Sequence, residues 1–354
     1  MSDELTSHQT EVTGHDVSKA GAPAGSPPTG SGLGGFLNSG LGRNLGLIIA
    51  LLLLCVVGFA TAGDRFAHTD NVLTILRLGS VIGVVSIGMT FVIAGGGIDL
   101  SVGAIVALSS VWATTLATQT MAADIHWVVM VLTALAVGAG CGLINGLLVA
   151  YGRVAPFIAT LAMLAGARGL AEIIAQRRTQ LVRDRDFINF FGGNLFGVPV
   201  LVIIFVLVSV IGWVLLTRTT FGRRTLAIGG NPEAARLAGI HVRRQTALLY
   251  VLLGIACGIA AVMLMARTTT GTSTHGQLYE LDAIAAVVIG GTLLSGGRGT
   301  IVGTVLGVLI FTTLTNVFTL NNLDTSTQAV AKGIIIIAAV LLQQRVAERH
   351  RSSG

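Results

Sequence analysis

The sequence predicts an all-α integral membrane protein with about ten transmembrane helices. The first observation is composition, because 53% of the 354 residues are hydrophobic, 11% are charged and the mean hydropathy is +0.82. Soluble domains are more polar than this. The second observation is segment length, since a hydrocarbon core about 30 Å thick needs about 20 apolar residues per helix. Four runs satisfy that requirement: Leu45–Ala62, Val128–Ala150, Val154–Ala175 and Leu195–Leu216.

Six further apolar runs bring the expected total to about ten. They are Leu78–Ala94, Val102–Thr118, Thr246–Ala266, Ile284–Leu294, Ile301–Leu320 and Ala329–Leu342. We therefore expect one transmembrane domain over residues 45–343, followed by a short polar tail over 344–354. Residues 1–44 are rich in glycine, proline and serine and carry no apolar period, so they are expected to form a disordered tail. The first run then is a retained anchor rather than a signal peptide.

Arginine distribution predicts the orientation in the membrane. Residues 217–244 hold a single acidic residue, Glu233, against Arg218, Arg223, Arg224, Arg236, Arg243 and Arg244. Positively charged loops stay in the cytoplasm, so this loop and the basic C-terminus are expected there, and an even number of crossings places the N-terminus there too. By the same count of crossings, the arginine-rich stretch 176–194 lies on the outer side of the membrane. It is therefore an exception to the rule that positively charged loops stay in the cytoplasm. The net charge of +6 fits an anionic membrane surface and gives no indication of nucleic-acid binding.

Catalytic signatures are absent from the sequence. A P-loop needs a lysine after its glycine-rich turn, and the only lysines, Lys19 and Lys332, are not in such a motif. Neither H-E-x-x-H nor G-x-S-x-G occurs, and the three cysteines lie singly in apolar runs. We therefore expect no enzymatic activity, no bound cofactor and no metal site.

Two apolar runs are interrupted by glycines. The stretch Gly95, Gly96, Gly97, Asp99 and Ser101 precedes the run at Val102, and a similar stretch precedes Ile301. Laying Val102-Gly103 over Val302-Gly303 aligns the two as a repeat with the same orientation, which predicts two parallel-related halves. Broken helices within a membrane must line a cavity or be buried in protein, and paired breaks indicate a transport pathway. The predicted pathway or gate residues are Gly95, Gly96, Gly97, Asp99, Ser101, Asn145, Gly290, Gly291, Thr292, Ser295 and Arg298.

Several interpretations of these residues stay open. Asp99 either only caps the helix that begins near Val102 or also acts as a gate, and pairing with Arg298 across the halves is a further alternative. Asn145 is expected to form a hydrogen bond between helices in preference to contacting cargo. Glycines spaced four apart on the same helix predict close approach of a neighbouring backbone: Gly138, Gly142 and Gly146.

A short helix is predicted inside the cytoplasmic loop. Asn231 can cap it, Pro232 suits its first position, and Gly239 can end it in a left-handed conformation. A helix of about two turns is marginal in water, so it must lie against something. We expect a docking surface there, with an interfacial helix on lipid headgroups as the alternative. Its residues are Asn231, Pro232, Glu233, Ala234, Ala235, Arg236, Leu237, Ala238 and Gly239, and Ala234, Leu237 and Ala238 share one face.

Four stretches together resemble the permease subunits of bacterial ATP-binding-cassette importers for ribose and related monosaccharides. They are GMTFVIAGGGIDLSVGAIVALSS, RVAPFIATLAMLAGARGLAEII, TTFGRRTLAIGGNPEAARLAGIHV and LDAIAAVVIGGTLLSGGRGTIVGTVLG, within a likeness that covers Leu45–Leu342. The resemblance implies a multi-pass protein of the bacterial inner membrane. Its implied partners are a second permease copy, a cytoplasmic ATPase subunit that uses ATP and Mg, an extracytoplasmic sugar-binding protein, and membrane lipid.

The resemblance also implies roles for particular residues. Asn231–Gly239 corresponds to the coupling helix that sits in a cleft of the ATPase, and Gly96–Ser101, Gly290–Thr292 and Gly296–Gly299 lie by the translocation pathway. Two alternatives remain: a permease for another small solute such as branched-chain amino acids, and a secondary transporter driven by an ion gradient. The second would need several carboxylates in the spans, and Asp99 is almost the only one expected there.

Overall fold

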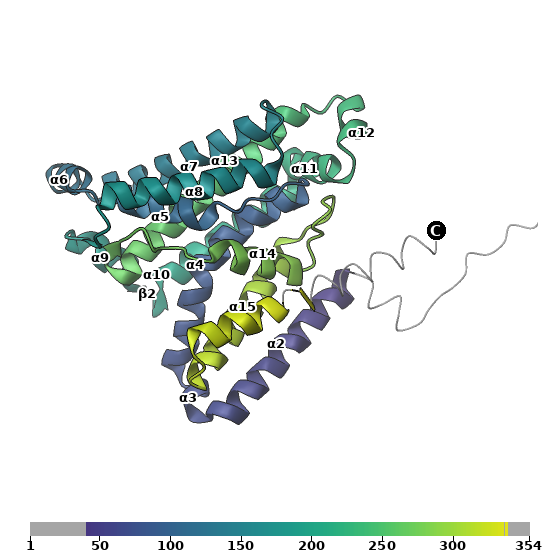
Figure 1. The fold of residues 1–354 in the computed structure, drawn as a ribbon. Helices are drawn as coiled ribbons and strands as arrows, with labels where there is room; N and C mark the ends of the chain where they lie inside the picture. The colour runs from purple at the N-terminus through teal and green to yellow at the C-terminus, as the bar shows by residue number, and fades with distance from the viewer. Residues whose placement is uncertain (1–39, 336, 339–354) are drawn as a thin grey trace, which may run out of the picture.

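The computed structural model describes residues 40–335, 337 and 338, and within them it is a helical bundle with very little sheet (Figure 1). Seven helices are long and apolar enough to cross a membrane, which confirms the predicted fold class. They are α2 (Gly40–Ala62), α4 (Thr69–Ala94), α7 (Val128–Ala150), α8 (Pro156–Ala175), α10 (Val200–Arg218), α13 (Val242–Thr268) and α15 (Ile301–Leu320). The first helix begins inside the predicted 1–44 tail; the rest of that tail and the 344–354 tail lie outside the described residues.

The remaining predicted spans differ from expectation. The run Val102–Thr118 is divided into α5 (Val102–Ala113) and α6 (Leu116–Asp124), which meet at 56° and together form a possible eighth span. The division falls at Thr115, whose hydroxyl accepts the amide N–H of Thr118 and so begins a new helix. The run Ile284–Leu294 is instead α14 (Tyr279–Ile289), with 11 residues too short to span alone. Part of Ala329–Leu342 lies beyond the described residues.

Short elements join the long helices. They are α3 (Asp64–Ala67), α9 (Arg185–Gly192), α11 (Thr220–Gly230), α12 (Pro232–Leu237) and the strand pairs β1 (Gln180–Leu181) with β4 (Thr270–Gly271) and β2 (Asn194–Leu195) with β3 (Val198–Pro199). The β2–β3 hairpin explains why α10 begins later than the predicted Leu195. Figure 1 shows α11 and α12 at one end of the bundle, with α3, α6 and α9 at the opposite end.

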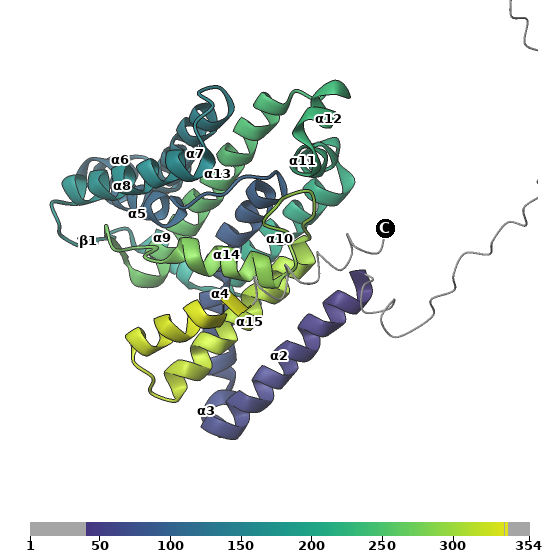
Figure 2. The ribbon, with the colours of Figure 1, turned by 45° about the vertical axis from the view of Figure 1, so that its right-hand side comes forward.

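Buried side chains concentrate on the central helices. Nearly every residue of α5 is buried, as are most residues of α13 and of the second half of α4. Large apolar side chains are instead exposed along α2, α7, α8 and α10, as expected where helices face lipid. Figure 2 shows α2 at the edge of the molecule, beside α15.

Glycines bring α7 and α13 into backbone contact. A Cβ atom on Gly138 would overlap the backbone at Gly254, and one on Gly142 would overlap the carbonyl of Tyr250. Gly146 faces Ala247 in the same way. The predicted close approach along this stripe is therefore confirmed, and it fixes the position of α13 in the centre of the bundle.

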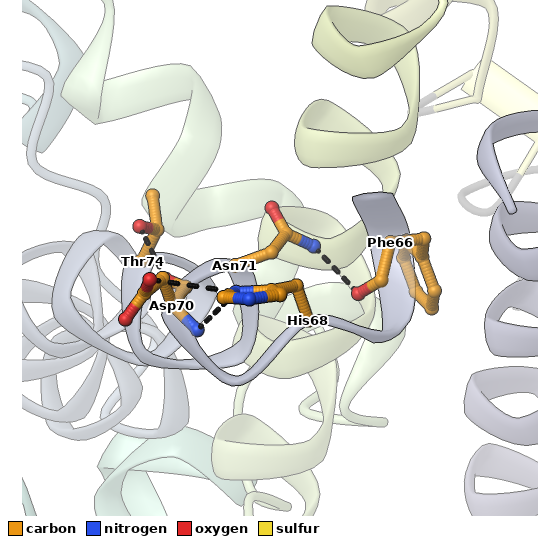
Figure 3. A network of polar contacts seen from close by, with 5 residues as sticks. All are labelled: Phe66, His68, Asp70, Asn71 and Thr74. Carbon is orange, nitrogen blue, oxygen red and sulfur yellow. Dashed lines mark hydrogen bonds and ion pairs between the residues drawn. The ribbon is translucent and has the colours of Figure 1, made fainter. Parts of the chain in front are cut away.

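A polar network fixes the turn where α4 begins (Figure 3). The amide N–H of Asp70 donates to Nδ1 of His68 at 3.4 Å, and the Asn71 side chain donates to the carbonyl of Phe66 at 2.9 Å. Asn71 also exchanges amide hydrogen bonds with Asn316 of α15, at 3.1 and 2.7 Å. These bonds hold the start of α4 against the end of α15.

Candidate functional site

The two glycine-interrupted loops meet in space. The loop of residues 95–101 joins α4 to α5, and the loop of residues 290–300 joins α14 to α15. The amide N–H of Gly297 donates to the carbonyl of Ala94 at 2.9 Å, and a Cβ on Gly296 would lie 2.9 Å from the Cα of Gly96. Both helix pairs therefore turn at the same end of the bundle, which agrees with the same orientation predicted from the motif alignment.

Asp99 lies in a buried hydrogen-bond cluster just before α5. Its side chain is 1% exposed, and its Oδ1 accepts the amide N–H of Ser101 at 2.7 Å and the Ser101 hydroxyl at 2.5 Å. Nδ2 of Asn145, on α7, donates to Oδ2 of Asp99 at 3.2 Å and to Oγ of Ser101 at 2.9 Å. The predicted bond between helices through Asn145 is confirmed. Asp99 organises the start of α5, although Ser101 itself makes no side-chain cap.

Pairing of Asp99 with Arg298 is not what the structure shows. Asp99 is held by Ser101 and Asn145, while the side chain of Arg298 is exposed on the second loop. The predicted pathway residues thus divide into three sets by exposure. Gly96, Ser295 and Arg298 are exposed; those that are buried are Asp99, Ser101, Asn145, Gly290 and Thr292, with Gly95, Gly97 and Gly291 intermediate.

An arginine that the sequence interpretation did not single out holds a second irregular segment. Arg168, on α8, donates through one guanidinium nitrogen to the carbonyls of Ser273 and of His275, the latter at 2.9 Å. These carbonyls belong to the segment 269–278 between α13 and α14, which consists of β4 followed by turns and runs along α5. A Cβ on Gly271 would meet Thr114 near the end of α5, and one on Gly276 would meet Gly103 near its start.

Buried polar groups accompany this segment. Nδ1 of His275 lies 3.1 Å from the hydroxyl of Ser110 on α5, and His275 is 8% exposed. One carboxyl oxygen of Glu280 is buried close to Gly103, and Arg168 interacts electrostatically with Glu280. Irregular backbone and charged groups inside a membrane bundle are both typical of functional regions. The sequence did contain a signal for this site, because two charged residues, Arg168 and Glu172, lie inside the apolar run Val154–Ala175.

A half-buried ion pair lies beside α14. Nζ of Lys332 lies 3.3 Å from Oδ1 of Asp282 on α14, and the two side chains are 20% and 13% exposed. Lys332 also lies over the ring of Phe311, 4.9 Å from its centre. Asp282 and Glu280 thus add two carboxyl groups on α14, a helix too short to span the membrane alone.

The short helix α12 has the predicted termini. The amide N–H of Ala234 donates to Oδ1 of Asn231 at 3.0 Å, Pro232 begins the helix, and Gly239 has a φ of 80°. Glu233 and Arg236 form an exposed ion pair at 2.9 Å. Ala235 is the residue buried against the rest of the chain, whereas Leu237 is 83% exposed and Ala234 and Ala238 are exposed as well. The face formed by these last three residues is thus free for a partner.

Comparisons with known proteins agree with this architecture. Residues 71–340 match the family described as the permease component of the branched-chain amino acid transport system. The chain is 45% identical over 307 residues to a ribose import permease protein of Bacillus subtilis, covering 86% of this chain and 92% of that protein. Identity to the ribose import permease protein of Escherichia coli K12 is 38% over 321 residues, covering 90% and 98%.

A D-allose transport system permease protein of Escherichia coli K12 is 34% identical over 304 residues, covering 86% of this chain and 92% of that protein. No solved structure matches the chain. Since the family model and these relatives extend over nearly all of the helical bundle, the chain belongs to this family of transport-system permease components.

Proposed function

We propose that this chain is the transmembrane permease subunit of an ATP-binding-cassette importer for monosaccharides of the ribose type. The observation that carries the proposal is the 45% identity, over 86% of the chain, to a ribose import permease. Relatives named for L-arabinose and D-allose support a monosaccharide more than a branched-chain amino acid, although the family description names the latter. The chain itself uses no cofactor in this proposal, and ATP with Mg acts on the partner subunit.

The driving force enters through α12 in this proposal. This helix projects at one end of the bundle, and its exposed Leu237 offers an apolar contact for a cytoplasmic ATPase. Exposed arginines at the same end, Arg223, Arg224 and Arg236, would steer and orient an acidic partner surface. The first residues of α2 lie at this end too, so we infer a cytoplasmic N-terminus.

An ion-coupled secondary transporter is less well supported. Such a transporter needs carboxyl groups that can bind and release the coupling ion. Asp99 is engaged by Ser101 and Asn145, and Asp282 is paired with Lys332. Asp99 and Asp282 are therefore occupied by partners from their own chain, and the carboxyl group of Glu280 interacts electrostatically with Arg168.

The opposite end of the bundle would receive cargo. Exposed arginines follow α8 there, and we infer that this surface meets a sugar-binding protein: Arg177, Arg178, Arg183 and Arg185. A second permease copy would complete the pathway. When the ATPase subunits close on ATP, they would move α12 of each copy, and the bundle would switch the side from which the pathway is open.

Substitution of Leu237 tests this function. Leu237→Asp removes the apolar contact, which is worth about 1.5–3 kcal/mol when a leucine is fully buried, and that corresponds to about 10- to 150-fold weaker ATPase binding. Binding is measured with the purified partner ATPase subunit, together with ATP-driven uptake of ribose into proteoliposomes. Leu116→Asp, an exposed leucine on α6 at the opposite end and outside the arginine-rich segment 177–185, is the control. Equal ATPase affinity and equal uptake for both variants would contradict the proposal.

A further inference from the structure

The helix α11 lies between α12 and the two glycine-rich loops. At its end, Gly230 is followed directly by Asn231, the capping residue of α12. Backbone hydrogen bonds continue from α11 into α12. The amide N–H of Asn231 donates to the carbonyl of Ala227, and the amide N–H of Ala235 donates to the carbonyl of Asn231, both at 3.0 Å. The two helices are therefore one mechanically connected unit.

Gly229 of this unit lies against both loops at once. A Cβ on Gly229 would overlap the carbonyl oxygen of Ala94 and the amide nitrogen of Gly297. Those two atoms form the 2.9 Å hydrogen bond that joins the first loop to the second. The backbone of α11 thus covers the single backbone bond by which the two loops are joined in the described part of the chain.

The surrounding contacts are also between backbones. A Cβ on Gly296, which has a φ of 83°, would lie 2.8 Å from the carbonyl oxygen of Gly229. One on Gly297 would lie 2.9 Å from the Cα of Gly230. We name this contact the glycine junction and define it as Ala94, Gly96, Gly229, Gly296 and Gly297. With no side chain between the three segments, a displacement of one must move the others, because there is no rotamer to absorb it.

The first half of α11 is anchored separately. The buried side chain of Gln245, on α13, donates to the carbonyl of Phe221 and to the hydroxyl of Thr225, both at 3.0 Å. Thr225 lies one turn before Gly229. The anchor leaves the end that carries Gly229 and α12 as the part of α11 able to turn, with Gln245 near the pivot.

We propose that Gly229 is a positioning residue that passes movement of α12 to both glycine-rich loops at the same time. This inference rests on the proposed function and adds the route by which the push reaches the interior. From the first loop the route continues to Asp99 and, through Asn145, to α7. From the second it continues into α14 and α15. Simultaneous movement of both loops would keep the two helix pairs, α4–α5 and α14–α15, open to the same side of the membrane.

Substitution of two adjacent glycines tests the route. Gly229→Ala places a methyl group into the junction, whereas Gly230→Ala, the matched control, meets nothing within 4 Å. Permease variants are reconstituted with the ATPase subunit, the sugar-binding protein and ATP, and ribose taken up per ATP hydrolysed is measured. Gly229→Ala is expected to lower this ratio about tenfold, the size of a typical coupling between sites. Its affinity for the ATPase and the behaviour of Gly230→Ala should stay at wild-type level.

The controls separate the two proposals. If the unmodified permease imports no ribose with its ATPase, the proposed function fails. If it imports ribose and Gly229→Ala transports as much per ATP as Gly230→Ala, only the coupling route fails.

ATPase binding removes the question of misfolding. A Gly229→Ala permease that binds the ATPase with wild-type affinity is folded at its cytoplasmic end, so a lowered ratio of ribose to ATP then reports on the coupling route. A Gly229→Ala permease that binds the ATPase and transports ribose at the wild-type ratio would overturn the proposal.

Discussion

Replacement of Arg168 by methionine is expected to release the segment 269–278 from the bundle. Arg168 donates to the carbonyls of Ser273 and His275, and methionine retains the apolar part of the side chain without any donor. His275 is buried and Ser273 is partly buried. Losing their partner should therefore favour local opening of the segment and leave the long helices in place.

The size of the effect follows from the number of bonds. A hydrogen bond to a charged group contributes about 1.5–3 kcal/mol. Both bonds come from the same guanidinium nitrogen, so we count them as between one and two bonds, about 2–4 kcal/mol in the free energy of local opening. At 1.4 kcal/mol per factor of ten, opening becomes about 30- to 800-fold more frequent. Arg168→Lys, which can reach one carbonyl, should give an intermediate change.

Hydrogen exchange measured by mass spectrometry in lipid nanodiscs reports this opening directly. Peptides covering residues 269–278 should exchange faster in Arg168→Met by the stated factor, with α4 and α13 unchanged. Arg178→Met, which removes an exposed arginine just beyond the same helix, is the control. The reasoning is refuted if Arg168→Met exchanges in this segment at the rate of Arg178→Met.

Two further substitutions test the packing of the interior. Gly142→Ala should lower the unfolding temperature in detergent, because the added methyl group overlaps the carbonyl of Tyr250 at a cost of about 1–3 kcal/mol. Gly140→Ala is the control and should leave the unfolding temperature unchanged, because its methyl group meets nothing within 4 Å. Equal unfolding temperatures for the two variants would contradict the assigned α7–α13 contact. Lys332→Met should destabilise by about 1.5–3 kcal/mol, the cost of losing a hydrogen bond to a charged group, because it leaves the half-buried Asp282 unpaired. Adding Asp282→Leu should recover most of that loss in the same melting experiment, and a double variant no more stable than Lys332→Met would contradict the half-buried pair.

Features that depend on neighbouring residues were predictable from the sequence. The apolar run Ile301–Leu320 is α15 with the same bounds, since a long run without breakers leaves few alternatives. The cap of α12 follows from the order of Asn231 and Pro232, because the groups that satisfy each other are three residues apart. The stripe of Gly138 and its neighbours also predicted its contact, although not that the facing helix would be α13.

Features that depend on distant residues could not be predicted in this way. The segment of turns before α14 is held by Arg168, which is 105 residues from Ser273 in the chain. The pairing of Asp282 with Lys332 joins residues 50 positions apart. Periodicity and capping report only on local structure, so an apolar run that is interrupted for tertiary reasons looks like an ordinary span. The roles of the pathway residues stay predictions.

The central claim of this account is that the chain is moved by ATP hydrolysed on a partner and does not use an ion gradient itself. Ribose accumulation in proteoliposomes tests it most directly, with permease alone or with permease, ATPase subunit and sugar-binding protein. Accumulation should require the partners and ATP, and permease alone under a proton or sodium gradient should accumulate nothing. Accumulation by permease alone under either gradient would contradict the account.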